Sequence, residues 1–236
     1  MNSFLHSLPV PRTRVASFRR SLCGSAALAG LLLGSGCGSL LPKAASPPFL
    51  YALDSVPASG ATTASATPAQ ATRVPGTAPT LVVNPTRATP GFDSQHIVYV
   101  RVAHQREHFA HSEWVDTPAR MLAPLIVAAV EHAGTFSAVV PLASGLDASL
   151  RLDTELLRLQ QEFGAGPSRV RFTLRAYLLD GRTRRVLAWR EFDETVASAS
   201  EDPYGGVVAA NRAVLRVMEQ LATFCGEAAR GWVPPG

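Results

Sequence analysis

The sequence lacks the short motifs that mark common enzyme classes. It contains no nucleophile elbow, no HExxH pair, no phosphate-binding loop and no paired-cysteine metal site, and each of these motifs supports a distinct chemistry. It also lacks a long hydrophobic run, because the most apolar stretch, residues 22–36, has 15 residues and includes four glycines. A bilayer core requires roughly 20 apolar residues, so this stretch is not expected to span a membrane.

Acidic residues are absent from the N-terminal region, which instead contains the basic residues Arg12, Arg14, Arg19 and Arg20. The apolar run follows them, and small residues precede Cys37. A basic region, a short apolar region and a small-residue cleavage site are the three parts of a secretory signal. We therefore predict that residues 1–36 are a cleavable signal peptide and that Cys37 begins the mature chain.

The residues before Cys37 resemble the bacterial lipobox, in which an aliphatic residue and two small residues precede the cysteine. Ser35 and Gly36 fit this pattern, whereas Gly34 occupies the aliphatic position and Leu33 lies one step earlier. The resemblance implies a diacylglyceryl thioether on the Cys37 sulfur and a fatty amide, such as palmitate, on its amino group. Several acyl chains together give stable membrane attachment. Gly38 is not the aspartate that signals inner-membrane retention, so the resemblance implies the periplasmic face of the outer membrane.

Only three cysteines occur in the sequence. Cys23 is removed with the predicted signal and Cys37 is lipidated, which leaves Cys225 alone. An intramolecular disulfide is therefore excluded from the predicted mature chain, even in an oxidising compartment. Cys225 is expected to be a small apolar residue near a helix end.

The formal net charge is +4, and taken alone it would suggest a nucleic-acid partner. The position of the excess charge argues against this interpretation. The chain has 22 basic and 18 acidic residues, and all four excess charges lie in the predicted signal. The mature part is therefore formally neutral, and its charge predicts no nucleic-acid binding.

Composition divides the mature part into a tether, a domain and a tail. Residues 37–48 are small, polar and proline-bearing, which is typical of a spacer between lipid and fold. Residues 49–226 are predicted to form one α+β domain, with an Ala/Thr/Ser/Pro-rich insertion at 57–80 that has no periodic apolar face. Residues 227–236 are predicted to be a C-terminal tail.

Apolar periodicity predicts strands followed by a helix, and then strands followed by a second helix. In residues 96–102 the valines are expected to form the buried face, and a change of phase near Leu156-Leu157 indicates a bulge. Thr117 and Pro118 predict the first helix start, and Gly134 its end. The expected strands are 49–53, 81–83, 96–102, 107–112, 136–140, a strand from 148 with the bulge, 169–178 and 184–196; the second helix is 206–224. This order predicts an α+β fold with two helices packed on one largely antiparallel sheet.

Four histidines, His96, His104, His108 and His111, lie close together in the sequence. Spacings of four and three would suit zinc ligands on a helix, but the surrounding pattern is that of strands. On a strand His104 and His108 share a face and His111 points away. We therefore expect solvent-exposed histidines and no metal site.

Arg169, Arg171 and Arg175 lie on one face of the clearest strand and could bind an anionic group. Glu191 and Asp193 lie on the expected neighbouring strand, where cross-strand ion pairs would neutralise the arginines. We favour this structural interpretation. Trp114 is likewise expected in the core.

Four segments together resemble a known family, the auxiliary lipoprotein components of ABC-type transport systems encoded beside MCE-domain lipid transporters. They are FLYAL (49–53), LVVNPTRATPGFDSQHIVYVR (81–101), EWVDTPARMLAPLIVAAVEHAGTFSAVV (113–140) and GGVVAANRAVLRVMEQLATF (205–224). The resemblance implies a non-enzymatic, membrane-anchored periplasmic protein without cofactors that assists lipid transport between the inner and outer membranes. Its partners would be an MCE-domain protein and the ABC transporter components, and the family resemblance also allows homo-oligomers.

Two other functions remain open on the sequence. A periplasmic lipoprotein that itself binds a ligand or metal would have a closed apolar pocket or an ordered metal ion. A secreted hydrolase would require a serine, a histidine and an acid to converge in space, although no sequence motif for such a site is present.

Replacing Cys37 with alanine should release the protein into the soluble periplasm, because the acylated residue is lost. Fractionation of cells into membrane and soluble periplasm measures this, with Cys23→Ala in the removed signal as the matched control. Unchanged membrane retention of Cys37→Ala would show that the anchor has been assigned to the wrong residue.

Overall fold

The structure is a computed structural model that describes residues 47–54, 78–142 and 148–233. The predicted signal peptide, Cys37, most of the tether and residues 57–77 of the predicted insertion lie outside the described residues. The end of the insertion is described, and there Thr80 already belongs to a strand. The insertion therefore ends earlier than predicted.

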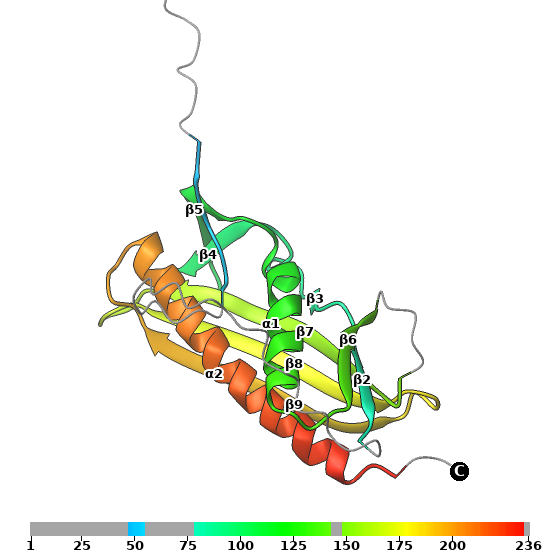
Figure 1. Ribbon diagram of the computed structural model, residues 1–236. Coiled ribbons are helices and arrows are strands. Elements are labelled where there is room, and N and C mark those ends of the chain that lie inside the picture. Colours follow the sequence, from blue (N-terminus) through cyan, green and yellow to red (C-terminus); the bar gives the residue numbers. More distant parts are fainter. Residues whose placement is uncertain (1–46, 55–77, 143–147, 234–236) are drawn as a thin grey trace, which may run out of the picture. The chain divides into compact units, whose positions relative to one another are not determined.

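The described residues contain two helices and nine strands that form one sheet (Figure 1). The strands are β1 (Phe49–Tyr51), β2 (Thr80–Val83), β3 (Arg87–Ala88), β4 (His96–Val100), β5 (Arg106–Trp114), β6 (Ala138–Pro141), β7 (Leu150–Glu162), β8 (Arg169–Asp180) and β9 (Val186–Ala197); the helices are α1 (Pro118–His132) and α2 (Pro203–Arg230). An α+β fold is therefore confirmed.

Strand β7 is the centre of the sheet. Along one edge it pairs with β8 over its whole length, and along the other it pairs in succession with β2, β3 and β4. Strand β6 extends the sheet beyond β2, while β5 and β1 extend it beyond β4. The sheet thus branches from β7, and β8 and β9 complete its other side.

A bulge in β7 preserves its buried face. The register with β8 shifts between Leu156 and Arg158, as the sequence predicts. Before the shift even-numbered residues such as Leu152 are buried, and after it odd-numbered residues such as Leu159 and Gln161 are buried. One extra residue reverses which positions face the core, so both halves of β7 contribute to the same hydrophobic layer.

The sheet is mixed, whereas the sequence analysis predicted a largely antiparallel one. The pairs β4·β5, β7·β8 and β8·β9 are antiparallel, but β1·β5, β2·β6, β2·β7, β3·β7 and β4·β7 are parallel. Parallel pairing requires a long crossover between strands, and α1 lies between β2 and both of its parallel partners, β6 and β7. Alternation within a strand reports which face is buried but not the direction of its neighbour.

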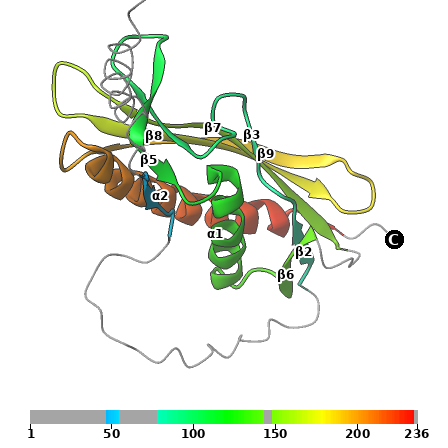
Figure 2. The ribbon, with the colours of Figure 1, turned by 90° about the horizontal axis from the view of Figure 1, so that it is seen from above.

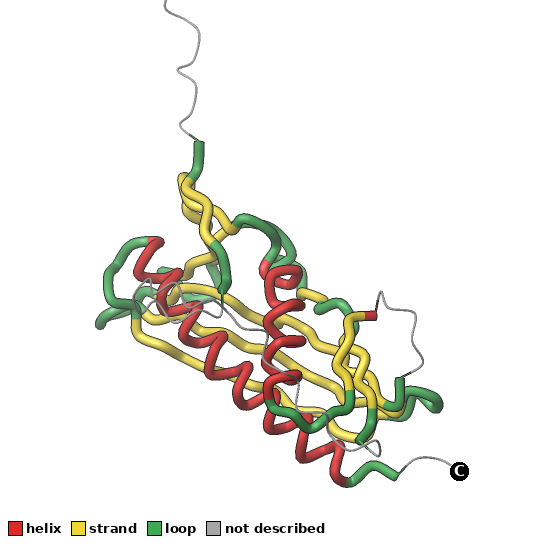
Figure 3. The backbone as a smooth tube through the Cα atoms, viewed as in Figure 1, coloured by secondary structure: helices red, strands yellow, loops and turns green. Residues whose placement is uncertain are grey.

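Both helices cover the same face of the sheet (Figures 2 and 3). The hydrophobic core lies between them and the strands, and its largest fully buried side chains include Phe172 and Leu174 of β8, Leu122 of α1 and Leu221 of α2. Val170, Phe172, Leu174, Ala176 and Leu178 are all buried, which confirms the alternation predicted for this strand.

Helix α1 begins and ends as predicted. Pro118 occupies the first turn, but Thr117 makes no side-chain capping hydrogen bond, so the proline rather than the hydroxyl determines the start. Gly134 follows the helix with φ +66°, a left-handed conformation that glycine adopts without a steric penalty.

Helix α2 is longer than the predicted 206–224. It begins at Pro203, where the Asp202 carboxylate accepts a hydrogen bond from the Gly205 N–H, and it continues to Arg230 because Cys225 and Ala229 extend the buried stripe. Part of the predicted C-terminal tail is therefore helical.

The valine face predicted for residues 96–102 is wrong. Ile97, Val98 and Tyr99 are all buried, whereas Val102 lies beyond β4 and is 59% exposed. Strand β4 is covered on both faces. Val98 is buried on one face. On the other face the Tyr99 ring contacts Phe109 at 4.5 Å between centroids and meets Phe163 edge-on at 5.8 Å. A strand covered on both faces does not show strict alternation.

No helix among the described residues is long and apolar enough to cross a membrane.

Two leucines of α2 test the position of the core. Leu221 is fully buried and Leu215 is 37% exposed. Leu221→Ala should lower the free energy of unfolding by about 2–5 kcal/mol, since it leaves a cavity, whereas the control Leu215→Ala should change it by less than about 1 kcal/mol. Denaturant unfolding measures both variants, and equal losses would contradict the assigned burial.

Candidate functional site

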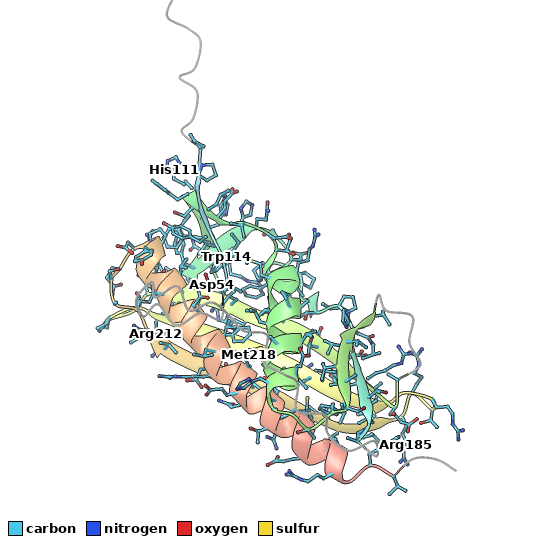
Figure 4. The ribbon with its side chains drawn as sticks, viewed as in Figure 1. Asp54, His111, Trp114, Arg185, Arg212 and Met218 are labelled. Carbon is cyan, nitrogen blue, oxygen red and sulfur yellow. The ribbon has the colours of Figure 1, made fainter. Side chains whose placement is uncertain are left out.

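The structure does not gather the four histidines into one cluster. The His96 and His108 rings are stacked with 4.4 Å between centroids, and His96 lies 3.9 Å from the Glu113 carboxylate. His104 has a left-handed backbone with φ 68° beyond the end of β4, and His111 lies toward the far end of β5 (Figure 4). Within the described residues no group of three His, Cys, Asp or Glu side chains is placed to hold a metal ion.

The arginine face of β8 is neutralised by neighbouring strands. Arg171 donates to Asp193 with an Nε–Oδ1 distance of 2.9 Å, and Arg175 lies directly opposite Glu191 and bonds to it at 2.8 Å. The hydrogen bond from Arg171 lowers the pKa of Asp193 below its usual value. The predicted cross-strand pairing is confirmed for these two arginines, whereas Arg169 lies against Glu162 of β7 instead. This face therefore offers paired charges rather than an anion site.

Trp114 and Cys225 both belong to the core, as predicted. Trp114 is 3% exposed and Cys225 is fully buried without a disulfide. Burial raises the pKa of the Cys225 thiol to about 12, so the reactive thiolate is scarce near neutral pH.

Asp180 joins the turn between β8 and β9 to the C-terminal end of the domain. One carboxylate oxygen accepts hydrogen bonds from the backbone N–H groups of Arg182 and Thr183 and from the Thr183 hydroxyl. The other accepts a hydrogen bond from the Trp232 indole N–H at 2.8 Å. These donors, with the Thr183 N–H first, hold the pKa of Asp180 well below its usual range. These hydrogen bonds therefore hold the turn between β8 and β9 against the C-terminal end of the domain.

A concave surface lies between the C-terminal halves of α1 and α2. It is a groove of about 720 Å³, which is within the range of small-molecule sites. Small residues from both helices line it, among them Ala129 of α1 and Ala222 and Gly226 of α2. Its lining comprises Leu125, Ala128, Ala129, His132, Ala133, Thr135, Leu215, Met218, Glu219, Ala222, Thr223, Gly226 and Arg230.

The polar groups of this interhelical groove lie at its rim. Met218 is buried and lies near the middle of α2 (Figure 4), whereas His132, Glu219 and Arg230 are exposed. An apolar floor with a few polar groups at its edge suits the binding of apolar matter.

The family model for the ABC-type transport auxiliary lipoprotein component matches residues 62–222. This chain belongs to that family. The match includes both helices up to Ala222 and all strands except β1. Membership in this auxiliary lipoprotein family confirms the resemblance seen in the sequence, and a transport accessory of this kind suggests a non-enzymatic role.

Solved structures share the fold of this auxiliary lipoprotein at low sequence identity. Protein XCC0632 from Xanthomonas campestris, assigned to the family DUF330, is 21% identical with a TM-score of 0.61, over 65% of this chain and 86% of that one. An uncharacterised protein is 11% identical with a TM-score of 0.57, over 76% of this chain and 99% of the other. A comparison with curated proteins returns no match.

The sequence analysis did not predict the interhelical groove. Its alanines and Gly226 are ordinary helix residues in the sequence, and only the adjacency of α1 and α2 shows that they border a hollow. The small residues at 128, 129 and 133 of one helical segment and at 222 and 226 of the other are the signal that could have indicated it.

Asp180→Asn should make the thermal stability of the domain less dependent on pH under acidic conditions. Because the folded-state pKa of Asp180 is depressed, its stabilisation is present above the unfolded pKa of about 3.9 and is lost as the pH falls through the folded value. The variant should melt at a lower temperature than the wild type at pH 7, and the difference should shrink toward pH 3. Thermal unfolding followed by circular dichroism measures this, with the exposed Asp54→Asn as control. A difference that stays constant with pH would contradict the assignment.

Proposed function

We propose that this protein is a membrane-anchored periplasmic accessory of an MCE-type ABC transport system and assists lipid movement between the inner and outer membranes. The family match over residues 62–222 carries the proposal. In this role the ATPase and permease are separate chains, and this protein contributes binding and placement rather than chemistry.

The described surfaces support a role in assembly. The arginines Arg171 and Arg175 of β8 are paired with acids of β9, and the interhelical groove presents a mainly apolar surface. Partner binding uses apolar and shape-complementary surface more than unpaired charge.

The proposed location is the periplasmic face of the outer membrane, through lipid on Cys37. Gly38 after the cysteine supports outer-membrane sorting over inner-membrane retention. From this position the domain can meet the periplasmic part of an MCE protein held by the opposite membrane.

A second candidate function is that of a lipoprotein that itself binds an apolar ligand, and the interhelical groove favours it. Each buried methylene contributes about 0.8 kcal/mol, so an acyl chain in the groove would bind measurably. Saturable binding of a fluorescent fatty acid, reduced by Ala128→Phe and unchanged by Val186→Phe at the start of β9, which does not line the groove, would support this function.

The mature lipoprotein should co-purify with the MCE-domain protein of the proposed transport system. Solubilisation in mild detergent, affinity capture of the tagged lipoprotein and detection of the MCE protein measure this association. The Cys37→Ala form should still bind the periplasmic domain of the MCE protein in solution, which separates direct contact from shared membrane. An unrelated outer-membrane lipoprotein serves as the capture control. The proposal is wrong if no association occurs at micromolar concentration and the protein fractionates with the inner membrane.

A further inference from the structure

Several large apolar side chains are exposed around β1. Phe49 is 70% exposed, Leu50 is 60% exposed and Tyr204 is 62% exposed. Val115 is 46% exposed, and Tyr51 is half-buried. We call these five residues the tether-end patch.

The fold brings the tether-end patch together from three elements. Strand β1 pairs in parallel with the end of β5, with Phe49 opposite Ser112 and Tyr51 opposite Trp114. The Val115 N–H then donates to the Tyr51 carbonyl at 2.8 Å. The Tyr51 ring lies 6.4 Å from the Tyr204 ring at the start of α2. The five residues therefore lie together at one end of the domain, although Phe49 and Leu50 project from opposite faces of β1.

Neighbouring residues of the same segments are buried, which shows that the exposure is selective. Leu53 is 5% exposed and Trp114 is 3% exposed, so the inner sides of these segments already complete the core. Isolated exposed apolar residues are common, but contiguous ones mark protein or membrane interaction sites.

The patch lies where the chain arrives from its predicted lipid anchor. Phe49 follows Cys37 by twelve residues, a span of at most about 40 Å even when fully extended. His111 lies at this end of the domain and Arg185 at the opposite end (Figure 4). A short tether gives the patch an effective concentration at the membrane in the millimolar range, so even weak attraction produces contact.

We propose that the tether-end patch rests in the interfacial layer of the leaflet that holds the lipid on Cys37. This inference rests on the anchoring part of the proposed function, but not on an MCE partner. Phenylalanine, leucine and tyrosine partition into this layer, where the apolar body is buried and the tyrosine hydroxyl stays among headgroups. The side chains of Asp54 and Glu113 beside the patch are acidic, so recognition rests on apolar contact rather than on anionic headgroups.

The contact orients the domain. With β1 against the membrane, the turn between β8 and β9 at Arg185 points toward the periplasm. The lipid and the patch then act as two attachment points, and two signals hold a protein to a membrane more firmly than one.

Spin labels on the full lipidated chain test the proposal. Nitroxide is attached at Leu50→Cys or at Tyr204→Cys in the patch, and at Val186→Cys at the opposite end as the matched control. Cys225 is buried and does not compete for the label. The protein is placed in phosphatidylethanolamine–phosphatidylglycerol vesicles, and accessibility to lipid-soluble oxygen is compared with accessibility to a water-soluble nickel complex. The same three labels on the soluble Cys37→Ala chain give the unanchored reference.

The two patch labels should favour oxygen in the anchored protein, whereas the Val186→Cys label should favour nickel in both forms. Phe49→Ser and Leu50→Ser are then added to the Tyr204→Cys protein. The ratio of molecules whose patch contacts the bilayer to molecules whose patch is in water should fall about tenfold or more. The chain should remain anchored and folded, because both side chains are largely exposed.

Three results would overturn the proposal. Patch labels as accessible to nickel as the Val186→Cys label would mean that this end does not touch lipid. Oxygen accessibility at Tyr204→Cys that survives both serine substitutions would mean that Phe49 and Leu50 do not drive the contact. Spin–spin broadening between Leu50→Cys labels would assign the patch to a second copy of the chain. None of these results depends on the MCE partner, because the vesicles contain no other protein.

Discussion

The edges of β7 are the constraint on which the rest of the fold depends. One edge is fully used by β8, and the other is divided among β2, β3 and β4. While its edges are paired in this way, β7 also keeps its apolar side toward the core over thirteen residues. The bulge between Leu156 and Arg158 makes this possible, since an unbroken alternation would turn Leu159 and Gln161 to solvent. The branch that carries β5 and β1 therefore depends on one irregular position.

Local patterns in the sequence were sufficient to predict much of this arrangement. The alternation in β8, the bulge in β7 and the pairs Arg171–Asp193 and Arg175–Glu191 follow from spacing alone, because neighbouring strands in a hairpin have a defined register. The start of α1 is likewise local, since a proline in the first turn is a short-range signal.

Features that depend on non-local neighbours could not be predicted in this way. The parallel partners of β7 are separated from it by dozens of residues, and nothing within β2 or β4 specifies their direction. The burial of Tyr99 could not be predicted from its own segment, because Phe163, which covers its ring, lies 64 positions away in the sequence. The interhelical groove has the same origin, since small residues become a hollow only when two helices lie side by side.

The two apolar surfaces of the domain differ in kind. The interhelical groove is concave and lined by small side chains, which suits a slender chain. The tether-end patch is formed by large projecting side chains, which suits a soft, deformable medium. Because the two surfaces are separate, contact at one leaves the other accessible.

The three tryptophans of the chain occupy three distinct surroundings. Trp114 is enclosed where β5 ends, Trp189 is 62% exposed on β9, and Trp232 is half-buried with its indole bonded to Asp180. Their intrinsic fluorescence can therefore be resolved by an aqueous quencher. The quencher reaches Trp189 in the folded protein. It reaches Trp232 when the C-terminal end loosens, and Trp114 only when the core opens. The order in which the three emissions are quenched would report which part of the domain unfolds first, without any added label.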